Sequence, residues 1–222
     1  MTQRPFDEKL TELEQRLLGM SHRIEGMVAD AVSLLAGGDE SGREDILRRD
    51  REVDAEEIAI EETCIELLAL HQPMATDLRL LVTILKINND LERIGDHAVN
   101  IAQAAIRLRE SVRRPELPPE LDEMARLAVS MLSGALDALV HRNAEEAAAI
   151  GARDDRVDAL HDSVFRIMLT HMLERDISAC LQIILVSRNI ERIADLATNI
   201  GEDVVFMVRG TTVRHPERPS TA

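Results

Sequence analysis

The sequence predicts an all-α protein made of two tandem three-helix bundles that are related by an internal duplication. Composition, apolar spacing and a repeated polar pattern all predict this fold. The residues A, V, I, L, M, F, W, Y and C make up 45% of the 222 positions, but aromatic residues make up only 1%. Strands favour aromatic and β-branched side chains, whereas this chain is rich in Leu, Ile, Ala, Glu and Arg. This composition favours helices packed through aliphatic side chains.

Three segments in the first half have the apolar period of a helix. In residues 10–34 the apolar positions alternate spacings of three and four, the pattern of a coiled-coil seam, and Gly37 and Gly38 end the segment. A second segment covers about residues 43–69 and is broken at Pro73. A third begins near Thr76 and keeps the three-four alternation as far as Leu108. We therefore expect a first three-helix bundle over residues 1–112.

The segment RRPELPPE, residues 113–120, has three prolines in eight positions and is the clearest boundary in the chain. Three further helices are predicted after it, over about residues 119–140, 144–173 and 176–208. The last of them stops at Gly210. A second bundle is thus expected over residues 119–210, followed by a polar, mobile tail over residues 211–222.

The two halves repeat one another in sequence. A shift of 99 residues places DLRLLVTILKINNDLERIGDHAVNI (77–101) over DISACLQIILVSRNIERIADLATNI (176–200). A shift of 104 places RDREVDA (49–55) over RDDRVDA (153–159). Any buried helix gives apolar identities, but the matching acids, arginines and asparagines indicate a duplication. The two shifts differ by five residues, which places a deletion in the loop between two helices of the second half, where loops tolerate such changes.

The repeat contains four pairs of acidic residues spaced by four. Side chains at i and i+4 lie one above the other on a helix, so each pair places two carboxylates on one face, where they repel unless a cation lies between them. Clustered carboxylate oxygens suit hard cations such as Mg²⁺, Ca²⁺ or Mn²⁺, and also iron. The simpler interpretation is a solvated acidic face. The candidate metal ligands are Asp50, Asp54, Glu92, Asp96, Asp154, Asp158, Glu191 and Asp195.

The orientation of these pairs is predicted from the helical phase at about 100° per residue. Glu92 and Asp96 are predicted to face away from the apolar seam of their helix, whereas Asp50 and Asp54 flank theirs. Arg93 and Arg192 recur beside the acids, and we expect each to form an ion pair with a nearby carboxylate.

The formal net charge of −15 argues against nucleic acid or an anionic membrane surface as the main partner. Cys64 and Cys180 lie far apart, form no CxxC pair and are interpreted as small core residues in a reducing compartment. The N-terminal residues have no apolar signal-peptide core, and the longest apolar stretch is too short to span a bilayer. We expect a cytoplasmic protein with no membrane insertion.

The sequence contains none of the motifs GxGxxG, GxxxxGK[ST], GxSxG or HExxH, and we expect no enzyme. The alternatives are a metal-dependent enzyme acting on a phosphorylated substrate and a metal-free helical adaptor. The enzyme would need a cationic clamp for phosphate beside the acids.

The segments NNDLERIGDHAVNIA (88–102), RNIERIADLATNIGEDVVFMVRG (188–210) and VRHP (213–216) resemble the signatures of the PhoU family, which assists and regulates phosphate transport. QPMATDLR (72–79) is similar to that family's loop into its third helix. The resemblance implies two three-helix bundles with pseudo-twofold symmetry in a cytoplasmic homodimer. It also implies contact with the ATPase subunit of the Pst phosphate transporter and with a PhoR-type histidine kinase. Metal at the eight acids named above is implied as well, because some members of the family bind metal clusters at such motifs.

Overall fold

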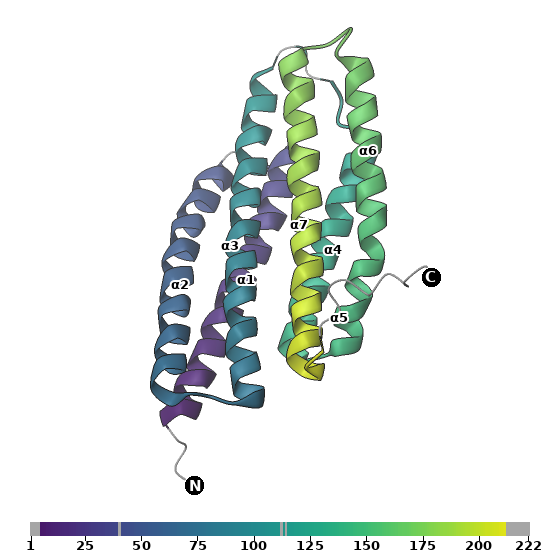
Figure 1. Cartoon of the computed structure of the whole chain (residues 1–222). Helices are drawn as coiled ribbons and strands as arrows, with labels where there is room; N and C mark the ends of the chain where they lie inside the picture. The colour runs from purple at the N-terminus through teal and green to yellow at the C-terminus, as the bar shows by residue number, and fades with distance from the viewer. Residues whose placement is uncertain (1–4, 40, 112, 114, 212–222) are drawn as a thin grey trace, which may run out of the picture.

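The computed structural model describes residues 5–39, 41–111, 113 and 115–211, and its helices are shown in Figure 1. All regular secondary structure in these residues is helical, with no strand. The long helices are α1 (Pro5–Leu35), α2 (Ser41–His71), α3 (Ala75–Glu110), α4 (Pro119–His141), α6 (Asp154–His171) and α7 (Ile177–Arg209). A short α5 (Ala144–Ile150) precedes α6. The predicted all-α class is confirmed.

The helices form two bundles side by side. In the first half α1, α2 and α3 pack on one another, and in the second half α4, α6 and α7 do the same, with α5 against α7. The bundles meet where α3 packs along α7, and these two helices run in opposite directions at the centre of the molecule, with α2 and α6 on the outer flanks (Figure 1). The arrangement confirms two three-helix bundles related by duplication.

Aliphatic side chains fill the core, as the composition predicts. The predicted seam of α1 is buried from Leu13 to Leu34, and Ile46, Val53 and Ile60 bury the sevenfold seam of α2. One continuous cluster of buried apolar residues runs through both halves. Burial of aliphatic surface on this scale is the main force that holds the helices together.

The segment predicted as one helix over residues 144–173 is interrupted, so that prediction is wrong in this respect. A 3₁₀ turn, Gly151–Arg153, separates α5 from α6, and α6 ends at His171. The break lets α5 approach α7 closely: a Cβ on Gly201 would lie 2.7 Å from the carbonyl oxygen of Ala147. Glycine at position 151 lowers the cost of leaving the α-helix there.

Residues between Glu110 and Pro119 connect the halves, as the proline-rich segment predicts. The exact domain limits stay a prediction. Of the predicted tail, residues 212–222 lie outside the described residues, and the VRHP segment lies among them. None of the described helices combines the length and the apolar character needed to cross a membrane.

Candidate functional site

The first group of predicted ligands comes together between α2 and α3. Asp50 and Asp54 lie on α2, and Glu92 and Asp96 lie on α3. Asp50 and Glu92 are half-buried between the helices, whereas Asp54 and Asp96 are exposed. The four residues, together with Glu57, are called the first acidic cluster from here on.

The electrostatics of the first cluster indicate that its carboxylates are close enough to repel one another across the two helices. Burial raises the pKa of Asp50, and the charges of Asp54 and Asp96 raise it further. Burial likewise raises the pKa of Glu92, with added repulsion from Asp96, Asp54, Glu57 and Asp50. Carboxylates with raised pKa values are destabilised in their charged form, which a bound cation would reverse.

The second acidic cluster lies between α6 and α7 and consists of Asp154, Asp155, Asp158, Glu191 and Asp195. Burial raises the pKa of Asp154 to about 6, and repulsion from Asp195, Asp158, Asp155 and Glu191 adds to the effect. The pKa of Asp158 is also raised, first by burial and then by Asp195 and Asp155. Each half thus brings together its four predicted acids.

Glu92 differs from its predicted orientation. The helical phase predicts that it faces away from the core, yet it is half-buried. The apolar seam of α3 indicates only the direction of the main core, and the face of α3 that carries Glu92 is covered in part by α2, which packs on α3. The prediction for Asp96 holds, because that side chain is exposed.

The two recurring arginines have different partners. Arg192 pairs with Asp195 inside the second cluster, with 2.8 Å between Nη1 and Oδ2. Arg93 lies 3.7 Å from Asp90, which is not one of the predicted ligands. Both expected ion pairs are present, but only the second half pairs its arginine with an acid of the cluster.

Three polar residues beside the clusters, Asn88, His161 and Ser187, were not predicted as site residues, and neither was Glu57 within the first cluster. In the first half, Asn88 is buried and its Nδ2 donates to the carbonyl oxygen of Glu57, 3.0 Å away, while its Oδ1 has no hydrogen-bond partner among the described residues. In the second half, Nδ1 of His161 lies 3.0 Å from Oγ of the buried Ser187. The repeat itself carries the signal: the shift of 104 places Glu57 over His161, and the shift of 99 places Asn88 over Ser187.

The donor set of each cluster fits a hard cation in chemistry, because it consists of carboxylate oxygens. The orphaned Oδ1 of Asn88, one turn from Glu92, adds a buried acceptor beside the first cluster. In the present side-chain positions, however, no three His, Cys, Asp or Glu side chains of the described residues converge on one point as metal ligands. Metal binding would therefore require these side chains to rotate toward one another.

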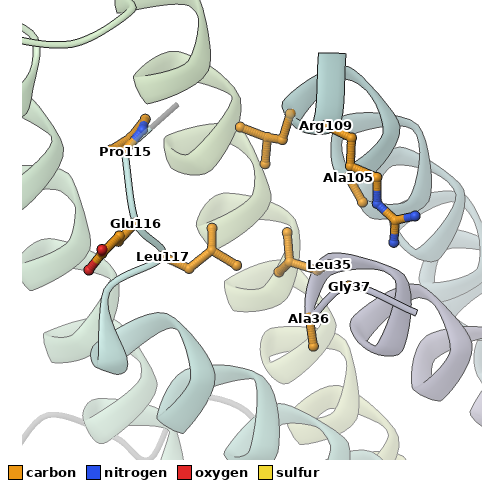
Figure 2. Close-up of a pocket in the computed structure, with 9 residues that line it drawn as sticks. Leu35, Ala36, Gly37, Ala105, Arg109, Pro115, Glu116 and Leu117 are labelled. Carbon is orange, nitrogen blue, oxygen red and sulfur yellow. The ribbon is translucent and has the colours of Figure 1, made fainter. Parts of the chain in front are cut away.

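A cavity of about 270 Å³ lies between the bundles, near the connection from α3 to α4, and is lined by Leu35, Ala105, Arg109, Leu117 and neighbouring residues (Figure 2). The guanidinium of Arg109 donates to the carbonyl oxygens of Leu34, 2.7 Å away, and Gly38. It thereby satisfies carbonyl groups at the end of α1, which is a structural role. We therefore interpret this cavity as a gap in the packing between the bundles and not as a binding site.

Similarity to known proteins is found in each of the two halves. A family model described as the PhoU domain matches twice, over residues 17–105 and 121–204. A phosphate-specific transport system accessory protein PhoU homolog from Pseudomonas putida is 38% identical over 95% of this chain and 83% of its own. The accessory protein PhoU of Escherichia coli K12 is 32% identical over 95% of this chain and 88% of its own.

Solved structures show the same fold. The crystal structure of PhoU from Pseudomonas aeruginosa superposes with a TM-score of 0.88 at 37% identity, over 93% of this chain and all of that one. The phosphate transport system regulatory protein PhoU from Streptococcus pneumoniae gives a TM-score of 0.86 at 32% identity, over 95% of this chain and all of that one. With two domain matches, long alignments and a shared fold, this chain belongs to the PhoU family.

Proposed function

We propose that this chain is a non-enzymatic accessory and regulatory protein of a phosphate-specific transport system. It would restrain phosphate uptake and phosphate-starvation gene expression through contact with the ATPase subunit of a Pst transporter and with a PhoR-type histidine kinase, in the cytoplasm. The observation that carries this proposal is the pair of equivalent acidic clusters, one between α2 and α3 and one between α6 and α7, in a PhoU fold. The names of the relatives support the same role.

Contact through these clusters would be electrostatic. Acidic faces meet basic patches of a partner, which speeds association and makes it sensitive to salt. Such a contact forms and breaks rapidly. A regulator that leaves its partner when the phosphate concentration falls would need a contact of this kind.

The proposal includes a divalent or iron-type cation at each acidic cluster. A cation between α2 and α3, or between α6 and α7, would offset the mutual repulsion of the carboxylates and fix the two helices relative to one another. Asp50, Asp54, Glu92 and Asp96 would hold it in the first half, and their repeat partners in the second.

A homodimer is a further part of the proposal. Large apolar side chains are exposed along α6, at Leu173 after it and along the first turns of α7, and exposed apolar surface favours protein contact. Mass measurement by light scattering tests this part on its own. The residues are Phe165, Leu169, Leu173, Ile177, Leu181 and Leu185.

The regulatory role is tested in a strain that lacks the gene. We expect phosphate-starvation reporters to stay on, or phosphate uptake to stay unrestrained, in high phosphate, and the wild-type copy to restore control. A copy with Glu92→Gln and Asp96→Asn should restore control poorly, whereas Glu8→Gln with Glu12→Gln, an exposed pair at the same spacing on α1, should restore it fully. Normal shut-off without the gene would overturn the proposal.

Association is tested by capture of tagged chain from phosphate-replete cells. The Pst ATPase subunit or the kinase should be recovered at low salt and lost as salt rises. Recovery of neither protein at low salt would contradict the proposed contacts.

A further inference from the structure

An arginine of the repeat has ion pairs in the first half that its counterpart in the second half lacks. Arg49 of α2 is 14% exposed and pairs with Asp30 of α1 and with Asp45 of its own helix. The shift of 104 that places Arg49 over Arg153 also places the buried seam of α1 over that of α4. The surroundings of the two arginines can therefore be compared position by position.

Both acidic partners are replaced in the second half. The shift places Gly134 over Asp30 and Ala149 over Asp45. Arg153 forms no ion pair with any residue that the structure describes. Because guanidinium groups bind carboxylates through paired hydrogen bonds, a carboxylate from outside the chain could take the place of the lost side chains.

Arg153 lines an open groove of about 690 Å³ between α1 and α4, which lie behind α3 and α7 in the view of Figure 1. Its Nη1 donates to Oγ of Ser130, 3.0 Å away, and Ser130 lines the same groove. This bond holds the guanidinium at the wall, while its other N–H groups stay available to a ligand. Gly134 is also part of the lining and has no side chain that could reach the arginine.

The other charges in the lining limit the charge of the ligand. Arg126 pairs with Asp122 on its own helix, with 3.2 Å between Nη2 and Oδ2. Glu25 and Asp137 line the groove as well, and each repels an anion. One guanidinium without an acidic partner, beside two acids, favours a ligand with a single negative charge. Phosphate, with a charge of about −1.5 to −2 at pH 7, is disfavoured.

The rest of the wall includes the aliphatic side chains of Ala29 and Val32 on α1 and of Ala125 and Val129 on α4. Sites for small ligands have volumes of about 300–1,000 Å³, so the groove is large enough for one. We propose that it binds a small organic monocarboxylate, whose carboxylate bonds to Arg153 and whose short aliphatic chain lies on this wall. Such a ligand would contact both bundles and act independently of the acidic clusters.

Hexanoate and hexanol are matched probes, because they share an aliphatic chain and differ in the charge of the head group. We expect saturable binding of hexanoate to the wild-type chain, with shifts of the Val32 and Val129 methyl signals in NMR spectra. Hexanoate should bind about fivefold more tightly than hexanol, the effect of one ion pair at the surface. Adipate, which adds a second carboxylate to the same chain, should bind more weakly than hexanoate.

Two variants test the role of the guanidinium. Arg153→Met keeps an aliphatic side chain and should abolish the preference for hexanoate over hexanol; the residue is exposed, so the protein should stay folded. Arg156→Met is the matched control, since Arg156 lies nearby on α6 but pairs with Glu123 and is not part of the lining. It removes the same charge and should leave the preference unchanged.

A third variant restores the acid of the first half. Gly134→Asp places a carboxylate at the position of Asp30, where it should pair with Arg153 and abolish the preference for hexanoate. Gly134→Asn, with a side chain of nearly the same size and no charge, should keep the preference. A Cβ at this position would lie 3.0 Å from Cδ1 of Ile150, at the end of a side chain that can move aside.

Three results would overturn the proposal. The first is wild-type protein that shows no saturable binding of hexanoate. The second is an Arg153→Met variant that keeps the full preference for hexanoate over hexanol, because the arginine would then not bind the carboxylate. The third is tighter binding of adipate than of hexanoate, which would contradict the selection for a single negative charge.

Discussion

The ammonium group of Lys86 in α3 lies 3.1 Å from Oδ1 of Asp203 in α7, so an ion pair joins the two bundles. The Asp203 side chain is only 2% exposed, and Lys86 also lies over the ring of Phe206, 5.3 Å from its centroid. The pair has no counterpart in the repeat, since the shift of 99 places Leu185 over Lys86 and Asp203 over Ala104. This contact therefore belongs to the junction between the bundles and is not part of the repeated pattern.

We expect Lys86→Met to lower the free energy of unfolding by about 1.5 kcal/mol, the low end for a hydrogen bond to a charged group, because Lys86 is itself 41% exposed. Urea denaturation followed by circular dichroism measures the change. Lys9→Met is the matched control, since the pair of Lys9 with Glu66 is exposed on both sides and such pairs contribute little. Equal losses in the two variants would contradict a special role for the junction.

The fold was predictable because its signals are local and repeated. Apolar spacing marks each helix, and glycine and proline mark the ends, so the seam of α1 and the boundary after α3 follow directly from the sequence. The interruption at Gly151 was not predictable, because it depends on how closely α5 packs against α7 at Gly201. Contacts such as Lys86 with Asp203 lack any periodic signal and emerge only in three dimensions.

The grouping of the acids was predictable to the same extent as the repeat, and their role as metal ligands stays a prediction. Repetition singled out the eight acids, and the structure brings them together in two groups of four. The helical phase did not predict that Glu92 is half-buried, because its burial depends on the position of α2. Asn88 and Ser187 occupy equivalent positions in the repeat but are not identical, so it is mainly their burial that distinguishes them from ordinary polar residues of a helix.

Both cysteines should be unreactive in the native protein. Burial, with a smaller contribution from Glu61, raises the pKa of the Cys64 thiol to about 12, and burial raises the pKa of Cys180 as well. At pH 8 the thiols are therefore neutral, and a neutral thiol is a weak nucleophile. Ellman's reagent should react slowly with native protein and rapidly in urea, whereas Ser41→Cys, at an exposed position, should react at once.

The raised pKa of the Cys64 thiol lowers the stability of the folded protein at high pH. The unfolded thiol of Cys64 loses its proton near pH 9, but the folded thiol keeps it up to about pH 12. Between these values the unfolded state binds fewer protons, so stability falls as pH rises. Cys64→Ala should reduce this loss; a pH dependence identical to wild type would contradict the raised pKa.

Asn143 determines where α5 begins. Its side chain accepts hydrogen bonds from the backbone N–H groups of Glu145, at 3.1 Å, and Glu146, at 3.2 Å. Loss of such an N-cap costs about 1 kcal/mol, so Asn143→Ala should lower the free energy of unfolding by that amount. Asn143→Ser should keep most of it, because a serine hydroxyl also caps helices. Equal stability of the alanine variant and wild type would exclude this role.

Removing carboxylates from one acidic cluster tests whether these acids bind metal or are needed for folding. Glu92→Gln with Asp96→Asn removes two carboxylates from the first cluster while keeping the shape of the side chains. Because burial and mutual repulsion destabilise charged Glu92, the metal-free variant should be at least as stable as metal-free wild type.

Metal content, measured by mass spectrometry on untagged protein loaded with Mn²⁺ or Fe²⁺ and then desalted, should fall by about half if each cluster binds alike. Glu8→Gln with Glu12→Gln should change nothing, because that exposed pair lies on α1, outside both acidic clusters. A variant that unfolds would show that Glu92 and Asp96 are structural. Wild-type protein that retains no metal under any loading condition would contradict the proposed cation. The acidic clusters would then serve as surfaces for a basic partner, since their charge and their position between α2 and α3 and between α6 and α7 do not depend on a cation.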